Sequence, residues 1–372
     1  MSGIKKEKTR DVSAPFAAPE KAPLFGALDL GTNSCRMLIA RPVGKEFEVV
    51  DAFSKTVYLG KGLDSTGRLS NTAMRRTISA LHVCQNKLRR NNVKHFRLVA
   101  TAACRQAENG REFVKRARKE ARLKLEIIKP AEEARLAVVG SASHVKSTTE
   151  QVLVVDIGGG STELVWLDLT GVRPDDRRGA MMRIPGELKK TKEVDGFAGV
   201  KVVDWISVPF GVTTLKDQFN DVEEDKAAYA MMAWYFEEFI TQFGPVGANY
   251  ASEILPNFQI IGTSGTITTI AATEMGLQRY DRKRVDGYEM TSASVEAEID
   301  RYLTGGPEWR ANNPCIGESR KELIMSGAAI LQAILSVWPT ELLPVAGRCL
   351  RTGLLYSQMV KEGCFNSRTH SG

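Results

Sequence analysis

The sequence predicts an α/β protein made of two similar domains that face each other across a cleft. The first observation is that short apolar segments typical of strands alternate with helical patterns along most of the chain. The second is a strand–turn–strand pattern that occurs twice, as LDLGTNSCRML and as VDIGGGSTELV. Aligning the two copies matches Asp29 with Asp156, Gly31 with Gly158, and Ser34 with Ser161. We interpret this match as an internal duplication.

Length and composition agree with two globular domains. The chain has 372 residues, which suits two domains of about 100–200 residues each. Its hydrophobic fraction of 43% and charged fraction of 26% are typical of a folded globular protein. No apolar run approaches the ~20 residues of a membrane span, so we expect no membrane partner.

The N-terminal residues 1–23 form a segment of their own. They include basic residues but no apolar core before Leu24, and therefore do not resemble a secretory signal. We expect a disordered, basic and solvated tail.

Cysteines and histidines argue against a soft-metal site. Six cysteines are scattered without a CxxC pair, and four histidines occur without HxH or HExxH spacing. A disulfide framework or a zinc site is therefore not expected, and a reducing cytoplasm fits. A bound metal would be a hard cation held by oxygen ligands.

The charge balance favours an anionic partner. The formal net charge is +7, and the sequence pI is about 9.0. Nucleic acid, a nucleotide or polyphosphate would each suit this charge. We find no nucleic-acid motif with interleaved aromatic residues, and so expect no specific nucleic-acid binding.

The first half of the chain reads as strands and helices in alternation. The segment 24–41 predicts two strands joined by a turn, and 95–101 predicts a short strand. Ser70 is placed to cap a helix with one apolar face, and Asn109 to cap a charged helix. Pro130 marks the first turn of a further helix.

The second half repeats this order from Val152 onwards. A strand, a glycine-rich turn and a strand are followed by 168–196, which predicts a loop or β-excursion because it is rich in Gly, Pro and charge. Long helices are expected through 223–242, and a strand at 258–262.

The turn Gly158–Gly160 has the composition of a phosphate-binding turn. It lacks both the helix-opening G-x-G-x-x-G of dinucleotide sites and the lysine of a P-loop, and it joins two strands instead. Backbone N–H groups in such a turn can converge on an anion, and the missing Cβ atoms allow close approach. Ser161 and Thr162 would add hydroxyl donors. A plain hairpin is the alternative, but it needs only one or two glycines.

Acidic residues beside this turn point to a metal. Asp156 and Glu163 would repel a bare phosphate but not one bridged by Mg²⁺. Asp29 on the facing turn would complete a ring of acidic groups. Each could alternatively be an ordinary turn residue. A third glycine–hydroxyl turn, Gly262–Thr266, precedes a helix whose N-terminus also favours an anion.

These three turns, in this order, resemble those of the superfamily that includes actin, sugar kinases and Hsp70-type chaperones. The detailed match is to the exopolyphosphatase / guanosine pentaphosphate phosphatase family. It is carried by DLGTNSCRMLIAR, ATAACRQAENG, PAEEARLA, VVDIGGGSTELV, IIGTSGTITTIAA and RCLRTGLLY. Together these motifs extend from Leu24 to about Lys361.

The resemblance implies an α/β fold with two actin-like ATPase (ribonuclease H-like) domains. The first domain would span 24–136 and the second 137–372, with a last helix at about 350–361 packing back on the first. The chain would be a short form without the HD-like C-terminal domain of longer members, and a homodimer.

The resemblance also assigns roles to residues. Glu133 would be the catalytic base, while Glu132, about 100° away around a helix, would point elsewhere. Asp156 and Glu163 would hold Mg²⁺ or another divalent cation. The residues expected to bind substrate phosphates are Asp29, Gly31, Thr32, Asn33, Ser34, Arg105, Gly158, Gly159, Gly160, Ser161, Thr162, Ser264 and Gly265.

The function so implied is that of a cytoplasmic exopolyphosphatase, which releases orthophosphate from the end of inorganic polyphosphate. A 5′-phosphohydrolase acting on guanosine pentaphosphate is the alternative within the family. A sugar or acetate kinase is a further alternative, although no sugar-binding signature is present. A non-catalytic sensor of polyphosphate or of guanosine tetra- or pentaphosphate is the fourth possibility. The role of Glu133 is the feature that distinguishes this sensor from the enzymes.

Overall fold

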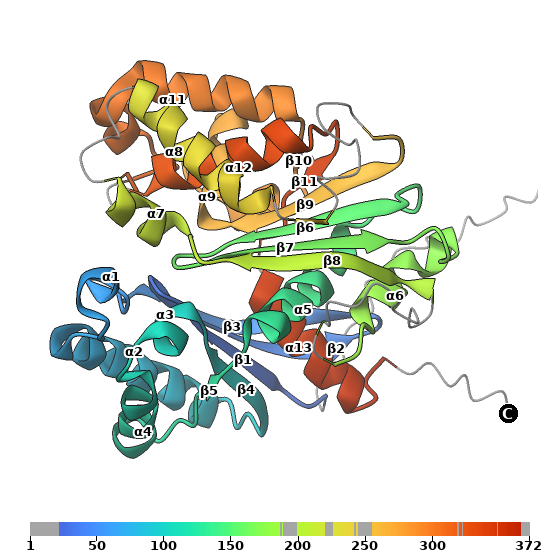
Figure 1. The fold of residues 1–372 in the computed structure, drawn as a ribbon. Coiled ribbons are helices and arrows are strands. Elements are labelled where there is room, and N and C mark those ends of the chain that lie inside the picture. Colours follow the sequence, from blue (N-terminus) through green and yellow to red (C-terminus); the bar gives the residue numbers. More distant parts are fainter. Residues whose placement is uncertain are drawn as a thin grey trace, which may run out of the picture.

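The computed structural model describes residues 22–186, 188, 199–219, 226–241, 243–244, 255–317, 320–321, 323–347 and 349–365. Two β-sheets, one from each half of the chain, form the centres of the two parts of the molecule (Figure 1). The predicted basic tail, up to residue 21, lies outside the described residues. Among the described residues, no helix has the length and apolar character needed to cross a membrane.

The first sheet has five strands in the order β3-β2-β1-β4-β5. Its strands are β1 (Phe25–Leu30), β2 (Ser34–Val43), β3 (Glu46–Thr56), β4 (His95–Ala100) and β5 (Glu126–Ile127). Strand β2 runs antiparallel to its neighbours β1 and β3, whereas β4 and β5 run parallel to β1. Helices α1 (Leu63–Thr66), α2 (Asn71–Arg90), α3 (Ala102–Gln106) and α4 (Gly110–Glu120) belong to this half.

The caps of two of these helices can be compared with the sequence. Helix α2 begins as predicted, because the Ser70 hydroxyl accepts a hydrogen bond from the Ala73 amide at 3.2 Å. The Asn109 side chain does not cap α4. It pairs instead with the backbone of Leu69, accepting from its amide at 2.8 Å and donating to its carbonyl at 3.0 Å. Asn109 therefore ties the start of α2 to the start of α4.

The second sheet has four strands in the order β8-β7-β6-β9. Its strands are β6 (Gln151–Ile157), β7 (Thr162–Asp168), β8 (Lys201–Val208) and β9 (Phe258–Ser264). A two-stranded sheet of β10 (Glu289–Met290) and β11 (Leu343–Pro344) lies nearby, and Val345 bridges to β9 in parallel. The helices are α7 (Val212–Gln218), α8 (Lys226–Ile240), α9 (Gly265–Glu274), α10 (Arg282–Val285), α11 (Ser292–Asn312) and α12 (Ile324–Val337).

The segment predicted as a loop or β-excursion is partly helical, which corrects that prediction. A 3₁₀ turn at Pro174–Asp176 leads into α6 (Arg177–Met182). Met181 is buried in the core, and Arg177 is buried with its guanidinium donating to the Ser147 carbonyl. The composition suggested a loop, but tertiary contacts of these two side chains stabilise a short helix. Residues 187 and 189–196 lie outside the described part.

The two halves repeat the same hairpin with the same register. Asp29 pairs across the ladder with Arg36, and Asp156 pairs with Glu163 at the equivalent place. In each turn the amide of the first glycine donates to a serine carbonyl, at 3.0 Å in one half and 2.9 Å in the other. The fold is therefore an α/β architecture of two similar halves, as the duplicated motif predicts.

Two helices join the halves. Helix α5 (Pro130–Ser141) begins at the predicted proline and packs on the second sheet, while α13 (Cys349–Lys361) packs on the first. Figure 1 shows both helices where the two sheets meet. A Cβ atom at Gly140 would overlap the Cys349 carbonyl, and one at Gly353 would overlap the Leu136 carbonyl. The backbones of α5 and α13 thus cross in direct contact.

Candidate functional site

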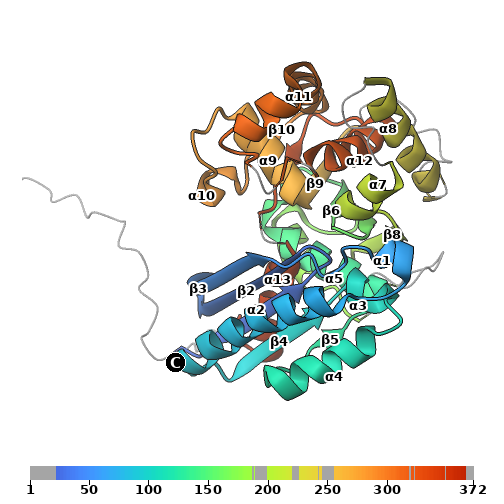
Figure 2. The same ribbon diagram turned by 90° about the vertical axis from the view of Figure 1, so that its left-hand side faces the viewer.

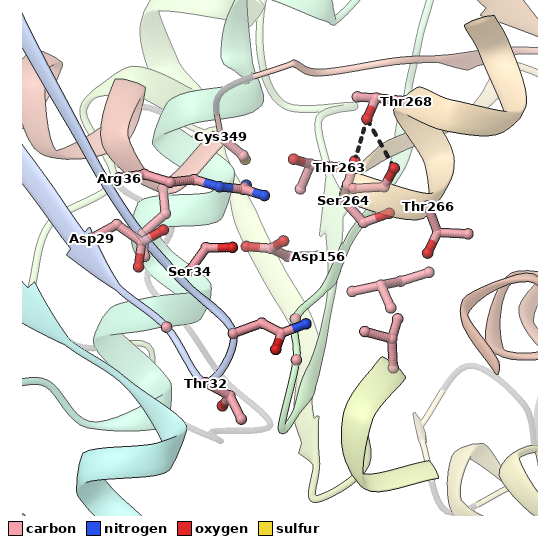
Figure 3. Close-up of a pocket in the computed structure, with 18 of the residues that line it drawn as sticks. Asp29, Thr32, Ser34, Arg36, Asp156, Thr263, Ser264, Thr266, Thr268 and Cys349 are labelled. Carbon is pink, nitrogen blue, oxygen red and sulfur yellow. Dashed lines mark hydrogen bonds between the residues drawn. The ribbon is translucent and has the colours of Figure 1, made fainter. Parts of the chain in front are cut away.

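A cleft of about 280 Å³ lies where the turns of the two halves face each other (Figure 3). The β1–β2 turn forms one wall, and the β6–β7 turn with the N-terminus of α9 forms the other. Most of the residues predicted from the sequence line it: Asp29, Gly31, Thr32, Asn33, Ser34, Glu133, Asp156, Gly158, Gly159, Gly160, Ser161, Ser264 and Gly265. The three predicted turns therefore converge on one cavity.

Three predicted residues stand behind the wall. The Thr162 hydroxyl is buried and donates to the Phe210 carbonyl at 2.8 Å. Glu163 is only 1% exposed, and its Oε1 accepts hydrogen bonds from the hydroxyls of Ser161 at 2.8 Å and Ser207 at 2.9 Å. Arg105 contacts Glu133 instead of lining the cavity. These side chains contact residues of the cavity wall and do not line the cavity themselves.

The glycine turn packs tightly against the opposite half. A Cβ added at Gly159 would lie 3.0 Å from the Thr32 Cβ, and one at Gly160 would lie 2.7 Å from the Thr32 hydroxyl oxygen. The space freed by these two glycines therefore admits the facing turn, where the sequence suggested a phosphate oxygen. Within the described residues, the amides of Gly159, Gly160 and Asn33 donate to no protein acceptor. These donors stay available for an anion.

The third turn is a capped helix start. The Ser264 hydroxyl accepts from the Ile267 amide at 2.7 Å, and Thr268 donates back to the Ser264 carbonyl at 2.8 Å. Figure 3 shows Ser264, Thr266 and Thr268 grouped at this end of α9 on one side of the cleft. Since the first amides of a helix have no partner within it, this end of the ten-residue α9 suits a negative group.

Glu133 stands at the first turn of α5, and the residue is only 7% exposed. The Arg105 guanidinium donates to Glu133 Oε2 and to the Ile128 carbonyl, each at 3.0 Å. Burial raises the pKa of Glu133 to about 8, with a further rise from Glu163 that Arg105 opposes. The structure thus presents a buried carboxylate held in one orientation at the wall of a polar cleft.

Glu132, the neighbour of Glu133, points elsewhere as predicted. Its carboxylate accepts from Arg97 at 2.6 Å and from Arg135 at 2.7 and 3.0 Å. Burial works against its ionised form, but these hydrogen bonds hold the pKa of Glu132 below its usual value. Glu132 is therefore an ion-pair partner outside the cavity wall.

Carboxyl groups crowd the inner part of the cleft. Burial raises the pKa of Asp156 to about 8, with added repulsion from Glu133 and Asp29. Burial raises the pKa of Glu163 to about 7 and that of Asp29 above its ordinary range. Four acidic groups that share a buried site are costly when all are ionised, and a cation among them would remove that cost.

The oxygen ligands that face the cleft suit a hard divalent cation. Asp29 and Asp156 line the cavity from opposite halves, close to the Ser34 hydroxyl (Figure 3). No group of three His, Cys, Asp or Glu side chains in the described ranges has metal-ligand geometry. Mg²⁺ commonly takes one or two carboxylates and completes its shell with water and phosphate oxygens, so two carboxylates fit it. Glu163 is a buried neighbour of that site and does not line the cavity.

Sequence reasoning missed the arginines of the cleft: Arg36, Arg282, Arg320 and Arg351 also line it. The strand pattern could have indicated Arg36. Residues two apart on a strand share a face, and Arg36 lies two residues after Ser34 on the same strand. Burial and the nearby Arg36 lower the pKa of Arg320, whose guanidinium donates to the Thr269 hydroxyl at 2.6 Å. No motif marks Arg282 or Arg320, because the start of α10 and the segment between α11 and α12 bring them to the cavity from far along the chain.

Comparisons with known proteins agree with the fold. The family model of the Ppx/GppA phosphatase family matches residues 38–362. A Ppx/GppA family member of Aquifex aeolicus is 27% identical with a TM-score of 0.69, and the match covers 91% of this chain and 98% of that one. An exopolyphosphatase from Cytophaga hutchinsonii is 22% identical with a TM-score of 0.73, covering 91% and 98%. An exopolyphosphatase-like protein is 24% identical with a TM-score of 0.74, with the same coverage.

Proposed function

Because the chain belongs to the Ppx/GppA phosphatase family, we propose that it is an exopolyphosphatase that hydrolyses the terminal phosphoanhydride bond of inorganic polyphosphate. The observation that carries the proposal is the position of Glu133. Its buried carboxyl group, oriented by Arg105, stands at the wall of a cleft whose turns present unpaired backbone amides.

Glu133 is the proposed general base. A general base must lie within reach of a water that attacks the substrate, and its pKa works best near the operating pH. The rise in the pKa of Glu133 to about 8 brings it into that range. Arg105 fixes the carboxylate by donating to Oε2, which leaves Oε1 for the proton of the attacking water.

The reaction balances with these parts. The water oxygen bonds to the terminal phosphorus, and Glu133 takes the released proton. The bond between that phosphorus and the bridging oxygen breaks, and its electron pair stays on the shortened chain. The unpaired amides of Asn33, Gly159 and Gly160 and the start of α9 hold the phosphate oxygens, whose charge must be stabilised in such a transfer.

A divalent cation, for which we propose Mg²⁺, would be held by Asp29 and Asp156. When bound, it would neutralise charge on the phosphate oxygens. The Ser161 and Ser207 hydroxyls keep Glu163 oriented behind Asp156. This arrangement adds negative potential behind the site, which favours a cation there.

The proposal is tested by Glu133→Gln with Glu132→Gln as its matched neighbour. We expect Glu133→Gln to lower the kcat for phosphate release by about 10²–10⁴-fold, while polyphosphate binding persists. Glu132→Gln should lose less than about tenfold, because Glu132 stands outside the cavity wall. Circular dichroism would confirm that both variants fold. Equal losses in the two variants would contradict the proposal.

The wild-type protein should be assayed on long polyphosphate and guanosine pentaphosphate side by side. A higher kcat/KM for polyphosphate is expected. A higher value for guanosine pentaphosphate would assign the 5′-phosphohydrolase activity instead. Tight binding of guanosine tetraphosphate without phosphate release from either substrate would assign a sensor.

A further inference from the structure

The cleft continues outward from the carboxylates along the first sheet. Asp29 on β1 is in register with Arg36 on β2, and Arg36 is in register with Ser54 on the edge strand β3. All three residues line the cavity. Because neighbouring strands lie ~4.8 Å apart, this row spans about 10 Å from the carboxylate end to the sheet edge. The floor is therefore longer than a single phosphate group requires.

The opposite wall of this outer part comes from the second half of the chain. Tyr280 and Arg282, just before and at the start of α10, line the same cavity as Ser54. Figure 2 shows α10 and β3 on the same side of the molecule, one from each half. The outer end of the cleft thus lies between the β3 edge and the α10 segment.

The surroundings of the Arg282 side chain suit a bound anion. Its Nε is buried and has no hydrogen-bond partner in the described part of the chain. The adjacent Asp281 carboxylate is engaged elsewhere, since it accepts from the Lys283 amide at 2.9 Å. The nearby Arg320 is a second cation, so the two guanidinium groups repel each other. A buried donor without a partner is costly, and an anion between these cations would remove both costs.

We propose that this outer end binds the distal phosphates of a linear polyphosphate chain, and that Arg282 is the residue that sets the preference for long chains. The inference rests on the proposed function, since the inner end would hold the terminal phosphate. Every internal unit of such a chain carries phosphate oxygens, and these would accept hydrogen bonds from the side chains of Arg36, Ser54 and Arg282.

The same wall is less suited to a nucleoside. Tyr280 is the aromatic side chain among the lining residues, and the Arg320 guanidinium already lies 5.2 Å from its ring centroid. Bases are commonly held by stacking on an aromatic ring, and a cation already covers one face of this ring. A chain of phosphates needs no such platform.

The test compares Arg282→Gln with Lys283→Gln, which removes an equal charge from an exposed position outside the cavity. Dissociation constants are measured with Mg²⁺ for inorganic tripolyphosphate and for a long polyphosphate of defined length. We expect Arg282→Gln to weaken long-chain binding about tenfold and tripolyphosphate binding by less than about threefold. Lys283→Gln should change the long-chain constant by less than about twofold, and Arg282→Lys should recover part of the loss.

Measuring binding instead of phosphate release tests this inference separately from the proposed activity. If the wild type binds long polyphosphate in an Arg282-dependent way but releases no phosphate, the proposed function fails and the inference stands. If Arg282→Gln affects both chain lengths equally, or no more than Lys283→Gln does, the inference is overturned. It is also overturned if the variant weakens guanosine pentaphosphate more than long polyphosphate. Thermal melting of each variant would show that the fold is retained.

Discussion

At the scale of single residues, Glu132 and Glu133 show how two adjacent carboxylates acquire different roles. Two arginines hydrogen-bond Glu132 and lower its pKa, whereas burial and neighbouring acids raise the pKa of Glu133. The cause is their angular separation of about 100° on α5, which sends one side chain toward Arg97 and the other into the cleft. The same helical turn therefore supplies an anchor and a reactive group.

Arg105 has a partner in the structure that the sequence did not indicate. The resemblance assigns it a contact with substrate phosphates, and its guanidinium hydrogen-bonds Glu133. Arg105 opposes the rise in the pKa of Glu133, so Arg105→Gln should raise that pKa further. Since a general base acts when ionised, the acidic limb of the pH–kcat profile should then move to higher pH, by about one unit.

Arg105→Lys is the reference variant, because it keeps the positive charge and should leave the limb within about half a unit of the wild type. Measured pH profiles of kcat distinguish this role from direct substrate contact. A raised KM in Arg105→Gln with an unmoved acidic limb would show that Arg105 binds phosphate instead.

At the scale of secondary-structure elements, local patterns were predictable and distant convergence was not. Ser70 and Pro130 mark helix starts because capping and first-turn chemistry act within a few residues. The turns that line the cleft could be predicted from the aligned hairpins, because the two copies share one register. Arg282 could not be predicted, since its place depends on how α10 lies over the edge of a sheet formed some 230 residues earlier. That packing leaves no local sequence signal.

The crossing of α5 and α13 is an element-scale constraint. Glycine inside an exposed helix usually costs about 1 kcal/mol relative to alanine, so replacement is normally favourable. At Gly140 and Gly353 the added methyl would overlap a backbone carbonyl of the other helix, which cannot move aside as a side chain can. The glycines therefore set the distance between the two helices that connect the halves.

We predict that Gly140→Ala and Gly353→Ala each lower the free energy of unfolding by about 1–3 kcal/mol, as overpacking does. Gly179→Ala in α6 is the matched control, since its methyl would meet only the flexible guanidinium of Arg183. The control should change stability by less than about 1 kcal/mol. Urea unfolding provides the measurement. Crossing variants as stable as the control would show that the helices separate easily.

At the scale of the whole molecule, each half contributes acidic and basic side chains to the cleft. Asp29 and Asp156 line its inner end from opposite halves with Arg36 near them, and Arg282 lines its outer end. Arg36 offsets only part of the cost of these buried acids, since the pKa of Asp156 is still raised to about 8, so a counter-ion between the halves would stabilise their contact. A cation at one end and a phosphate chain along the other would make the two halves attract.

This arrangement predicts how stability depends on pH and Mg²⁺. In the folded protein the pKa values of Glu133 and Asp156 are about 8 and that of Glu163 is about 7, against ordinary values near 4. Between about pH 4 and pH 8 the folded state therefore binds more protons than the unfolded state. Without a divalent cation, stability should fall as pH rises through this window, and above pH 8 the loss should be complete.

Thermal melting at pH 6 and pH 8 with and without millimolar Mg²⁺ checks this prediction. In the absence of the cation we expect Tm to be lower at pH 8 by at least about 1–2 °C, equivalent to about 1 kcal/mol for a chain of this size. Mg²⁺ competes with protons for the same carboxylates, so it should raise Tm more at pH 8 than at pH 6. Asp156→Asn removes one of the shared charges and should weaken both effects. A Mg²⁺-induced rise in Tm that is equal at the two pH values would show that the cation binds away from these carboxylates.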